Sequence, residues 1–362
     1  MLHTWKAWFE RNEKWVGPIG FLTGFIFDNL TLTRVDQWLD NLIIAGYIIL
    51  TGLCIVILNL YSAGRIQYRI VEKYVDFLPF VLQFAFGNLF SAFVVFYTRS
   101  GSLAGSWLFL LVLVVLFIGN ERFRRWYGRF VFQISIFFIA VFTYSVVIVP
   151  VLLRRIGPWI FIIGGGISLL LICVILYGMW RLIPERIWRS RYLLGICIGG
   201  IYLLFHLFYF TNIIPPIPLA LKESGVYHLI VPTGYGGYRV TFEPAPWYMP
   251  FHKYSTTYHQ QGETGVAYAY AAVFAPRRLT AKIVHHWRYF DEKKGRWVDG
   301  GEFGYEIVGG RDNGWRGYTL KQRIFPGRWR VDIATDRGQI LGRIKFKVVQ
   351  SDIIPKLVTE TR

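Results

Sequence analysis

The chain has 362 residues, of which 54% are hydrophobic and 18% aromatic, and its formal net charge is +18. Half of the basic excess lies in short segments between long apolar stretches, which is typical of membrane topology and argues against a nucleic-acid partner. All three cysteines lie inside those apolar stretches, so disulfides and a cysteine-based zinc site are excluded from the C-terminal part.

Seven long apolar stretches fill the first 212 residues. They cover residues 17–32, 40–60, 76–98, 103–119, 130–150, 158–180 and 191–211. A helix needs about 20 apolar residues to cross about 30 Å of hydrocarbon. The sequence therefore predicts an α-helical transmembrane bundle of about seven helices over residues 17–212, with the lipid bilayer as its first partner. Before it, residues 1–16 have no apolar signal core, and Trp5, Trp8 and Phe9 predict a cytoplasmic amphipathic segment.

The connections between these stretches differ in charge, and this difference predicts the orientation. Fourteen basic residues lie in the N-terminal segment and in the second, fourth and sixth connections: Lys6, Arg11, Lys14, Arg65, Arg69, Lys73, Arg122, Arg124, Arg125, Arg129, Arg181, Arg186, Arg189 and Arg191. The alternate side has Arg34, Arg99, Arg154 and Arg155. Because basic loops stay in the cytoplasm, we expect a cytoplasmic N-terminus. Seven crossings then place the C-terminal part on the outer face of the membrane, provided that the short first stretch spans.

An unusual group of polar residues lies at the end of the first stretch. Its members are Asp28, Thr31, Arg34 and Asp36. An ionisable group at this depth is costly unless it is paired, so Arg34, Arg99, Arg154 or Arg155 is the expected partner of Asp28. The group is interpreted either as an ion pair that fixes the first hairpin or as an ion or headgroup site at the outer mouth of the bundle. Asp76 and Gln83 in the third stretch would extend such a site along a substrate path.

Three consecutive glycines, Gly164, Gly165 and Gly166, interrupt the sixth stretch. They predict either close helix packing or a hinge at which the helix unwinds. His206 is the single histidine of the last stretch, and we interpret it as a hydrogen-bonded core residue in preference to a proton carrier.

The pattern changes after residue 212. A proline-rich linker over residues 213–224 is followed by alternation of apolar and polar residues up to residue 350. Trp329 and Val331, for example, would share one strand face, and Arg330 and Asp332 the other. Glycine-rich breaks separate several such runs. Residues 225–350 are therefore predicted to form an all-β domain, an antiparallel immunoglobulin-like sandwich, with residues 351–362 as a tail.

A set of spaced Trp, Gly and Phe residues in this part resembles a bacterial family, domain of unknown function 2914, over residues 280–349. The residues that carry the resemblance are His286-Trp287, Trp315-Arg316-Gly317-Tyr318-Thr319, Pro326-Gly327-Arg328-Trp329-Arg330-Val331-Asp332, Gly338-Gln339-Ile340-Leu341-Gly342 and Phe346. The resemblance implies a domain that follows a polytopic membrane part. It implies no reaction and no catalytic residue.

A stripe of basic residues on the last two predicted strands is the candidate ligand surface. It comprises Arg328, Arg330, Arg343, Lys345 and Lys347. The stripe is interpreted as a binding surface for anionic lipid headgroups or envelope polysaccharide, or as charge that protects a sheet edge from unwanted pairing. Trp247 lies in an aromatic loop that would seat on the membrane or cover a ligand groove.

The sequence predicts no metal site, no cofactor and no catalytic residue. His259 and Glu263 have the spacing of metal ligands on a helix, but the glycines around them predict a loop. The leading hypothesis is a bundle that anchors a periplasmic sandwich, which binds an envelope component or a protein partner of unknown identity. The alternative is a transporter or lipid-modifying enzyme with a polar site at the outer mouth of the bundle.

Overall fold

The computed structural model describes residues 25–26, 28–32, 34–101, 103–120, 126–234, 237–247, 253–353 and 355–362. The chain divides into two compact units. The first comprises Met1–Thr98 and Trp107–Ile213, and the second Arg99–Ser106 and Ile214–Arg362.

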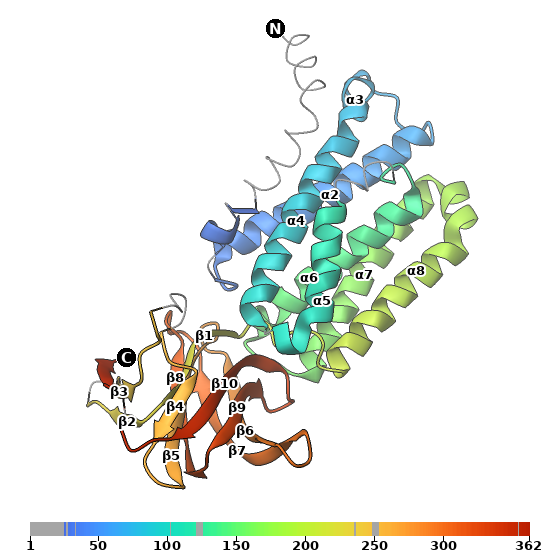
Figure 1. Ribbon diagram of the computed structural model, residues 1–362. Coiled ribbons are helices and arrows are strands. Elements are labelled where there is room, and N and C mark those ends of the chain that lie inside the picture. Colours follow the sequence, from blue (N-terminus) through green and yellow to red (C-terminus); the bar gives the residue numbers. More distant parts are fainter. Residues whose placement is uncertain are drawn as a thin grey trace. The chain divides into compact units, whose positions relative to one another are not determined.

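Seven helices run through the described part of the first 212 residues (Figure 1). They are α2 (Trp38–Ser62), α3 (Arg69–Tyr74), α4 (Leu78–Ser100), α5 (Leu103–Gly119), α6 (Phe130–Leu153), α7 (Pro158–Leu182) and α8 (Pro184–Phe210), with the 3-10 turn η1 (Val75–Phe77) between α3 and α4. Five helical segments are long and apolar enough to cross a membrane, and α5 adds a shorter apolar helix. Six of the seven predicted stretches thus form helices in the predicted order. The first, 17–32, lies mostly outside the described residues.

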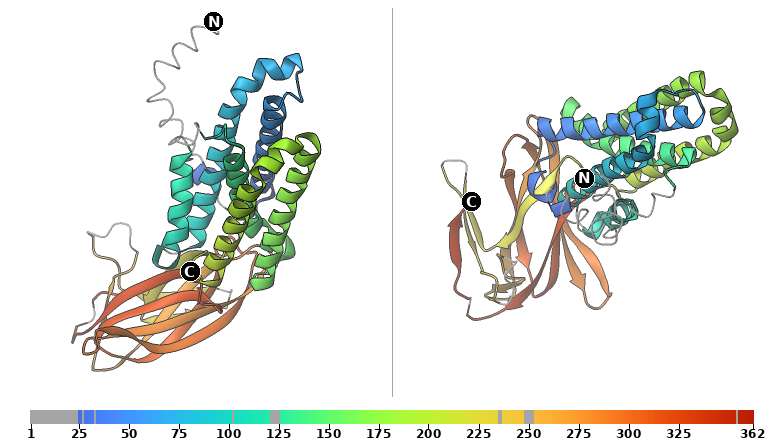
Figure 2. Two further views of the ribbon diagram at one scale, coloured as in Figure 1. Left: turned by 90° about the vertical axis from the view of Figure 1, so that its right-hand side faces the viewer. Right: turned by 90° about the horizontal axis from the view of Figure 1, so that it is seen from above.

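The long helices run alongside one another (Figure 2), and α6 is the most buried of them, in contact with α2, α7 and α8. The glycines of α7 explain part of this packing. A Cβ on Gly164 would lie 3.3 Å from the carbonyl oxygen of Ser145, and one on Gly165 would lie 3.1 Å from ring atoms of Phe142 and His206. Gly164 and Gly165 therefore permit close helix packing, whereas a Cβ on Gly166 would meet nothing within 4 Å; α7 continues as a helix through all three, so the segment is not unwound.

A chain of buried polar groups ties four helices together at one end of the bundle. Asn59 at the end of α2 donates from Nδ2 to Oε1 of Gln133 on α6, at 2.6 Å. Gln133 donates to the carbonyl oxygen of Tyr127, and the Tyr127 hydroxyl donates to Asn120 beyond α5. Asn120 then donates from Nδ2 to the carbonyl oxygen of Gln83 near the start of α4, at 2.8 Å. The ends of α2 and α5 and the starts of α4 and α6 therefore lie together.

The start of α8 lies at this same end. Arg186, in the first turn of α8, donates to the Ser62 hydroxyl and, at 3.4 Å, to the carbonyl oxygen of Asn59. The three connections that are rich in arginine, α2–α4, α5–α6 and α7–α8, thus share one end of the bundle. We call it the arginine end. The starts of α5 and α7 and the end of α8 lie at the opposite end.

The second unit contains 11 described strands (Figure 1). They are β1 (Ala220–Tyr227), β2 (Leu229–Pro232), β3 (Tyr238–Phe242), β4 (Thr257–Gln260), β5 (Gly265–Phe274), β6 (Thr280–Asp291), β7 (Arg296–Val308), β8 (Trp315–Ile324), β9 (Gly327–Thr335), β10 (Ile340–Gln350) and β11 (Val358–Thr361). They form three sheets, in the orders β1-β5-β8, β4-β10-β9-β6-β7 and β11-β3-β2. All pairings are antiparallel except that of β4 with β10.

Two apolar clusters hold these sheets together, and β5 contributes to both. Ala267 and Ala269 lie in a cluster with Trp287, Trp329 and other residues of the five-stranded sheet. Residues of the opposite face of β5, Tyr270 and Ala272, join a second cluster with side chains of β2 and β3. The sheet β1-β5-β8 is therefore apolar on both faces and lies between the other two.

The alternation of apolar and polar residues predicts the strands of residues 265–350. It does not predict the third sheet, β11-β3-β2. Strand β1 begins at Ala220, inside the range predicted as a linker, and residues 358–361 of the predicted tail form β11. Backbone pairing explains both differences, because β1 pairs with β5 and β11 with β3, whatever the side-chain pattern of these short segments.

Candidate functional site

The polar residues expected at the mouth of the bundle form separate contacts. The carboxylate of Asp28 accepts a hydrogen bond from the Ser91 hydroxyl of α4. Arg34 forms a two-point ion pair with Asp36, with 3.0 Å from Nε to Oδ1 and 2.8 Å from Nη2 to Oδ2. Thr31 is exposed. The described contacts thus join Asp28 to α4 and Arg34 to Asp36.

The structure does not bring Asp76 and Gln83 to Asp28. Asp76 is exposed in η1, at the arginine end, and the carbonyl oxygen of Gln83 accepts from Asn120. Ser91 follows Asp76 by 15 residues, which corresponds to about 22 Å at 1.5 Å per helical residue. A path that joins the two carboxylates would have to span this distance, and such a path stays a prediction.

The basic residues predicted as a ligand surface lie on one face of the sheet β4-β10-β9-β6-β7. Register pairs Arg343 with Asp332, Lys345 with Arg330, and Lys347 with Arg328 across β10 and β9. Directly opposed residues share a face, and the apolar alternates Trp329, Val331 and Phe346 lie in the core on the other side. We call this outward face the cationic face.

The next strand extends the cationic face. Arg288 of β6 pairs in register with Arg330, so that Lys345, Arg330 and Arg288 form one row across three strands. On β7 the row ends at Asp299, opposite Arg288. Alternation alone puts Arg288 on a polar face, but only the register of three strands places it beside Arg330.

A buried carboxylate lies beside this row. Asp332 is 3% exposed and accepts two hydrogen bonds from Arg343, one from Nε to Oδ1 and one of 3.1 Å from Nη2 to Oδ2. Its Oδ2 also lies 3.7 Å from Nε of Arg330 and 3.8 Å from Nη1 of Arg288. Three guanidinium groups thus surround one carboxylate, and Arg343 already neutralises it.

Arg330 is the least satisfied of these cations. Its side chain is 13% exposed, and its Nε has no hydrogen-bond partner. Burial lowers the pKa of the Arg330 guanidinium; Asp332 opposes this effect, and Arg343 and Arg288 add to it. The guanidinium lies over the Trp297 ring, 4.6 Å from its centroid. Stacking of this kind leaves the planar N–H edge available for an anion.

The outer part of the cationic face is accessible. Lys345 and Lys347 are exposed, and neither pairs with a carboxylate of the described residues. Arg328 lies over the Phe290 ring at 3.8 Å and pairs with Glu292 at 3.0 and 3.1 Å. Because Arg328 and Glu292 are both more than half exposed, this ion pair contributes little stability and exchanges readily.

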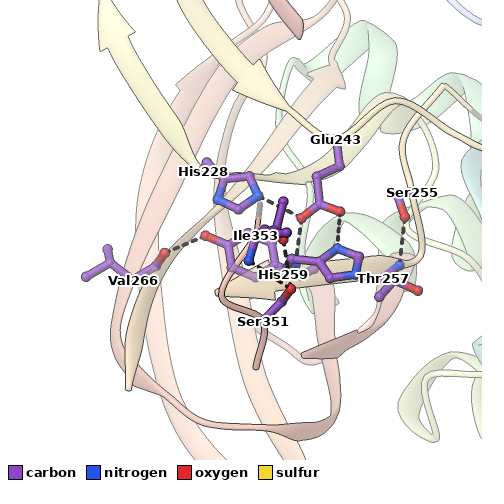
Figure 3. Close-up of polar contacts among 9 residues, drawn as sticks. His228, Glu243, Ser255, Thr257, His259, Val266, Ser351 and Ile353 are labelled. Carbon is purple, nitrogen blue, oxygen red and sulfur yellow. Dashed lines mark hydrogen bonds and ion pairs between the residues drawn. The ribbon is translucent and has the colours of Figure 1, made fainter. Parts of the chain in front are cut away.

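A second polar cluster, which the sequence analysis missed, centres on Glu243 at the end of β3 (Figure 3). Oε1 of Glu243 lies 2.8 Å from Nε2 of His228, and Oε2 lies 2.7 Å from Nδ1 of His259. The backbone N–H of His259 donates to Oε1 at 2.6 Å. The two imidazoles thus flank one carboxylate that is only 6% exposed. His228 follows β1 and His259 lies on β4, so the cluster joins three sheets.

The electrostatics of Glu243 are set by these donors. Burial would raise the pKa of the carboxyl, but the hydrogen bonds from His228 and from the backbone and ring of His259 outweigh burial and hold the pKa below its ordinary value. The carboxylate therefore stays ionised and acts as an acceptor. Along the chain it lies 15 residues from His228 and 16 from His259, and neither spacing marks the three residues as partners.

Glu243 also begins the loop that carries Trp247. Pro244 and Tyr254 form an isolated bridge, and the backbone N–H of Ser255 donates to the carbonyl oxygen of Glu243 at 2.9 Å. Trp247 is 91% exposed. Residues 248–252 of the loop lie outside the described residues. Trp247 thus belongs to a different element from the cationic face.

The other histidine of interest is structural. His285 is fully buried, with Nδ1 2.9 Å from the Thr319 hydroxyl and Nε2 3.2 Å from the Tyr305 hydroxyl. Burial, together with neighbouring His286, lowers the pKa of His285 to about 3. Trp287 donates to the same Thr319 hydroxyl at 3.1 Å. Across the described ranges, no group of three His, Cys, Asp or Glu side chains has the geometry of a metal site.

Comparison with known proteins adds a family match over part of the β region but no activity. No curated protein matches the chain. A solved structure described as "Pseudomonas fluorescens alkylpurine DNA glycosylase AlkC bound to DNA containing an abasic site analog" is 11% identical, with a TM-score of 0.20 over 78% of this chain and 82% of that one. A TM-score this low carries no argument about fold or activity. The resemblance expected over residues 280–349 is confirmed, because residues 280–348 match the family described as "Protein of unknown function (DUF2914)", and the whole cationic face lies within that match.

Proposed function

We propose that this protein is a multi-pass protein of a bacterial inner membrane, whose helical bundle anchors a periplasmic β domain that binds anionic groups of an envelope component. In this proposal the sheets β1-β5-β8 and β4-β10-β9-β6-β7 are the two halves of an immunoglobulin-like sandwich. The cationic face of the second sheet is the binding surface.

Exposed tryptophans on the helices support membrane insertion. Trp159 and Trp180, near the two ends of α7, are 75% and 40% exposed. They are 21 residues apart, about 32 Å along a helix, which matches the thickness of the hydrocarbon layer. Trp38 at the start of α2 and Trp188 in α8 are exposed at opposite ends in the same way. Tryptophan is enriched at both interfaces of a bilayer.

The arginine end supports the orientation. Basic connections remain in the cytoplasm, so the arginine end is assigned to the cytoplasmic side. Helix α8 starts at that end with Arg186 and ends at Phe210 on the other side. The β region, which follows α8, therefore leaves the bundle on the periplasmic side whether or not residues 17–32 span. Only the side of the N-terminus depends on that first stretch.

The single observation that carries the binding role is the row Lys345, Arg330 and Arg288. Three cations in register on adjacent strands repel one another, and the one buried acid beside them, Asp332, is already paired with Arg343. A surface that protects only a sheet edge needs charge on the edge strand, but β9 and β6 are interior strands. An external anion would relieve the repulsion and accept hydrogen bonds from the cations of the row.

The test uses the full chain in nanodiscs of phosphatidylcholine, a lipid without net charge. Binding of tripolyphosphate would be measured at low salt for the wild type and for the variant Arg288→Gln/Arg330→Gln. We expect the wild type to bind and the variant to lose about tenfold or more in affinity, because two of the three cations in the row are removed.

The matched control is Lys293→Gln/Lys356→Gln, which removes the same charge from exposed positions outside the row. It should bind as the wild type does. Thermal melting of each variant separates loss of binding from loss of folding. Absence of binding by the wild type, or an equal loss in the control, would show that the row is not an anion site.

A further inference from the structure

The charges of the cationic face differ between the two directions of the sheet, across the strands and along them. Across the sheet from β10, the row Lys345, Arg330 and Arg288 ends at Asp299, and Asp332 in the neighbouring row leads through His286 to Glu302. The β7 edge is therefore acidic. Along β10, in contrast, the cations continue from Lys345 to Lys347. An anion that extends across the strands meets Asp299, whereas one that extends along β10 meets a second row of cations, in which Glu292 forms an exposed pair with Arg328.

Two rows of cations repeat along this direction. Lys345 faces Arg330, and two residues further on Lys347 faces Arg328. Alternate residues of a strand are about 6.7 Å apart and neighbouring strands about 4.8 Å. The four side chains therefore form a ladder about 5 Å wide with a step of about 7 Å, which we call the cationic ladder.

The borders of the cationic ladder carry little further free charge. On the outer side, β10 is flanked by β4, whose residue in register with Lys347 is the uncharged Thr257. At one end, Arg343 is neutralised by its two-point pair with Asp332, so the free positive charge ends there. Among described residues, the only acid paired with the four cations besides Asp332 is Glu292, through its exposed pair with Arg328.

The two arginines of the cationic ladder are already held in place. Arg330 lies over Trp297 and Arg328 over Phe290, with guanidinium-to-centroid distances of 4.6 and 3.8 Å. Ring stacking already restricts each arginine side chain to few rotamers. Binding therefore costs less side-chain conformational entropy. A guanidinium stacked in this way presents its planar donors to phosphate or carboxylate oxygens.

We propose that the cationic ladder binds a linear polyanion with a phosphate or carboxylate in each repeat, laid along β10 with successive charges in successive rows. The proposal rests on the anion-binding role proposed above and names its ligand class. A single small anion occupies one row and leaves the repulsion in the other, whereas a chain neutralises both rows and loses the entropy of association only once.

The experiment compares probes of one chemistry and increasing length. The full chain in phosphatidylcholine nanodiscs would be titrated with inorganic phosphate, tripolyphosphate and long-chain polyphosphate at equal total phosphate. We expect affinity per phosphate to rise about tenfold or more from inorganic phosphate to the long chain. For four contacts, the logarithm of long-chain affinity should fall against the logarithm of salt concentration with a slope of about 3.

The variant Lys345→Glu/Lys347→Glu should remove most of the dependence on length, because both rows lose a cation. The control Lys293→Glu/Lys356→Glu, with the same change in charge at exposed positions elsewhere, should keep it. A third variant, Lys345→Gln/Lys347→Gln, guards against misfolding by repulsion or new pairing and should give an intermediate result.

The possible failures are distinct. Equal affinity per phosphate for short and long probes would refute the proposal of a polymeric ligand and leave the anion-binding role intact. Tighter capture of phosphatidylglycerol vesicles than of long-chain polyphosphate at equal phosphate would overturn the polymer in favour of a lipid surface. No binding of any probe by the wild type would overturn both proposals.

Discussion

Glu243 accepts two hydrogen bonds from a single residue, His259: one from the backbone N–H at 2.6 Å and one from the ring at 2.7 Å. The second imidazole, that of His228, completes the set. This arrangement fixes the end of β3 against the edge strand β4 and so closes the base of the loop that carries Trp247. The carboxylate makes this connection between sheets together with ring packing, since the His228 ring stacks on Tyr258 of β4 with centroids 4.1 Å apart.

Removal of the carboxylate should destabilise the β region. We expect Glu243→Ala to lower its free energy of unfolding by about 2–4 kcal/mol, because three donors lose a charged acceptor in a buried place. His259→Ala should cost less, since the backbone N–H of residue 259 still donates to Glu243. Denaturant unfolding followed by hydrogen exchange of residues 253–260 measures both effects. The exposed Glu263→Ala is the control; a loss as large as that of Glu243→Ala would refute the role of the cluster.

Stability of the β region should depend on pH through His285. Its pKa is about 3 in the folded state and near 6.5 when exposed, so the unfolded chain binds a proton that the folded chain does not. This proton favours unfolding increasingly as pH falls from about 6.5 towards 3, by up to about 1.4 kcal/mol per pH unit. In the variant His285→Phe, the free energy of unfolding should lack this contribution to its dependence on pH. Parallel slopes for the two proteins would disprove the burial of a neutral imidazole.

The hydrogen bond between Asn59 and Gln133 should couple α2 to α6. A double-mutant cycle with Asn59→Leu and Gln133→Leu should give a coupling free energy of about 0.6 kcal/mol and at most about 1.7 kcal/mol, the range for bonds between membrane helices. Asn88→Leu is a suitable control, because Asn88 bonds to Phe84 of its own helix. It should show no coupling to Gln133→Leu.

Asp28 should act as a helix-packing residue of the bundle. Because the amide oxygen of an asparagine side chain can still accept from the Ser91 hydroxyl, Asp28→Asn should leave thermal melting in detergent nearly unchanged. Asp28→Leu should lower stability by about 1 kcal/mol. Ion and proton flux into proteoliposomes distinguishes this role from the transporter alternative: flux by the wild type that Asp28→Asn abolishes at normal folded yield would favour transport.

A reporter enzyme that is active only outside the cytoplasm should be active when fused after Arg362 and inactive when fused after Arg65. The first expectation follows from the direction of α8 and the second from the arginine end. Activity of the fusion after Arg65 and not of that after Arg362 would invert the orientation. The control is a fusion after Arg155, at the opposite end of the bundle, which should resemble the fusion after Arg362.

Several features of this chain follow from the sequence alone. Long apolar runs with basic connections predict six of the helices, because each helix satisfies its own backbone and needs no distant partner. Period-two alternation places Arg343, Lys345 and Lys347 on one face of β10 for the same local reason. The spaced Trp and Gly residues indicate the family of residues 280–348 before any fold is known.

Tertiary structure decided the rest, because it depends on strand register and on contacts between distant residues. Alternation shows which residues share a face of one strand, but not which residues lie opposite each other on neighbouring strands. Only the folded sheet shows that Arg288 lies opposite Arg330 and Asp332 opposite Arg343. Glu243, His228 and His259 come from three separate segments, and no sequence motif marks them as partners. The third sheet likewise depends on which short strands pair. Apolar and polar residues alternate in β3, but this alternation cannot show that β3 pairs with β2 and β11, because backbone hydrogen bonds do not depend on side-chain identity.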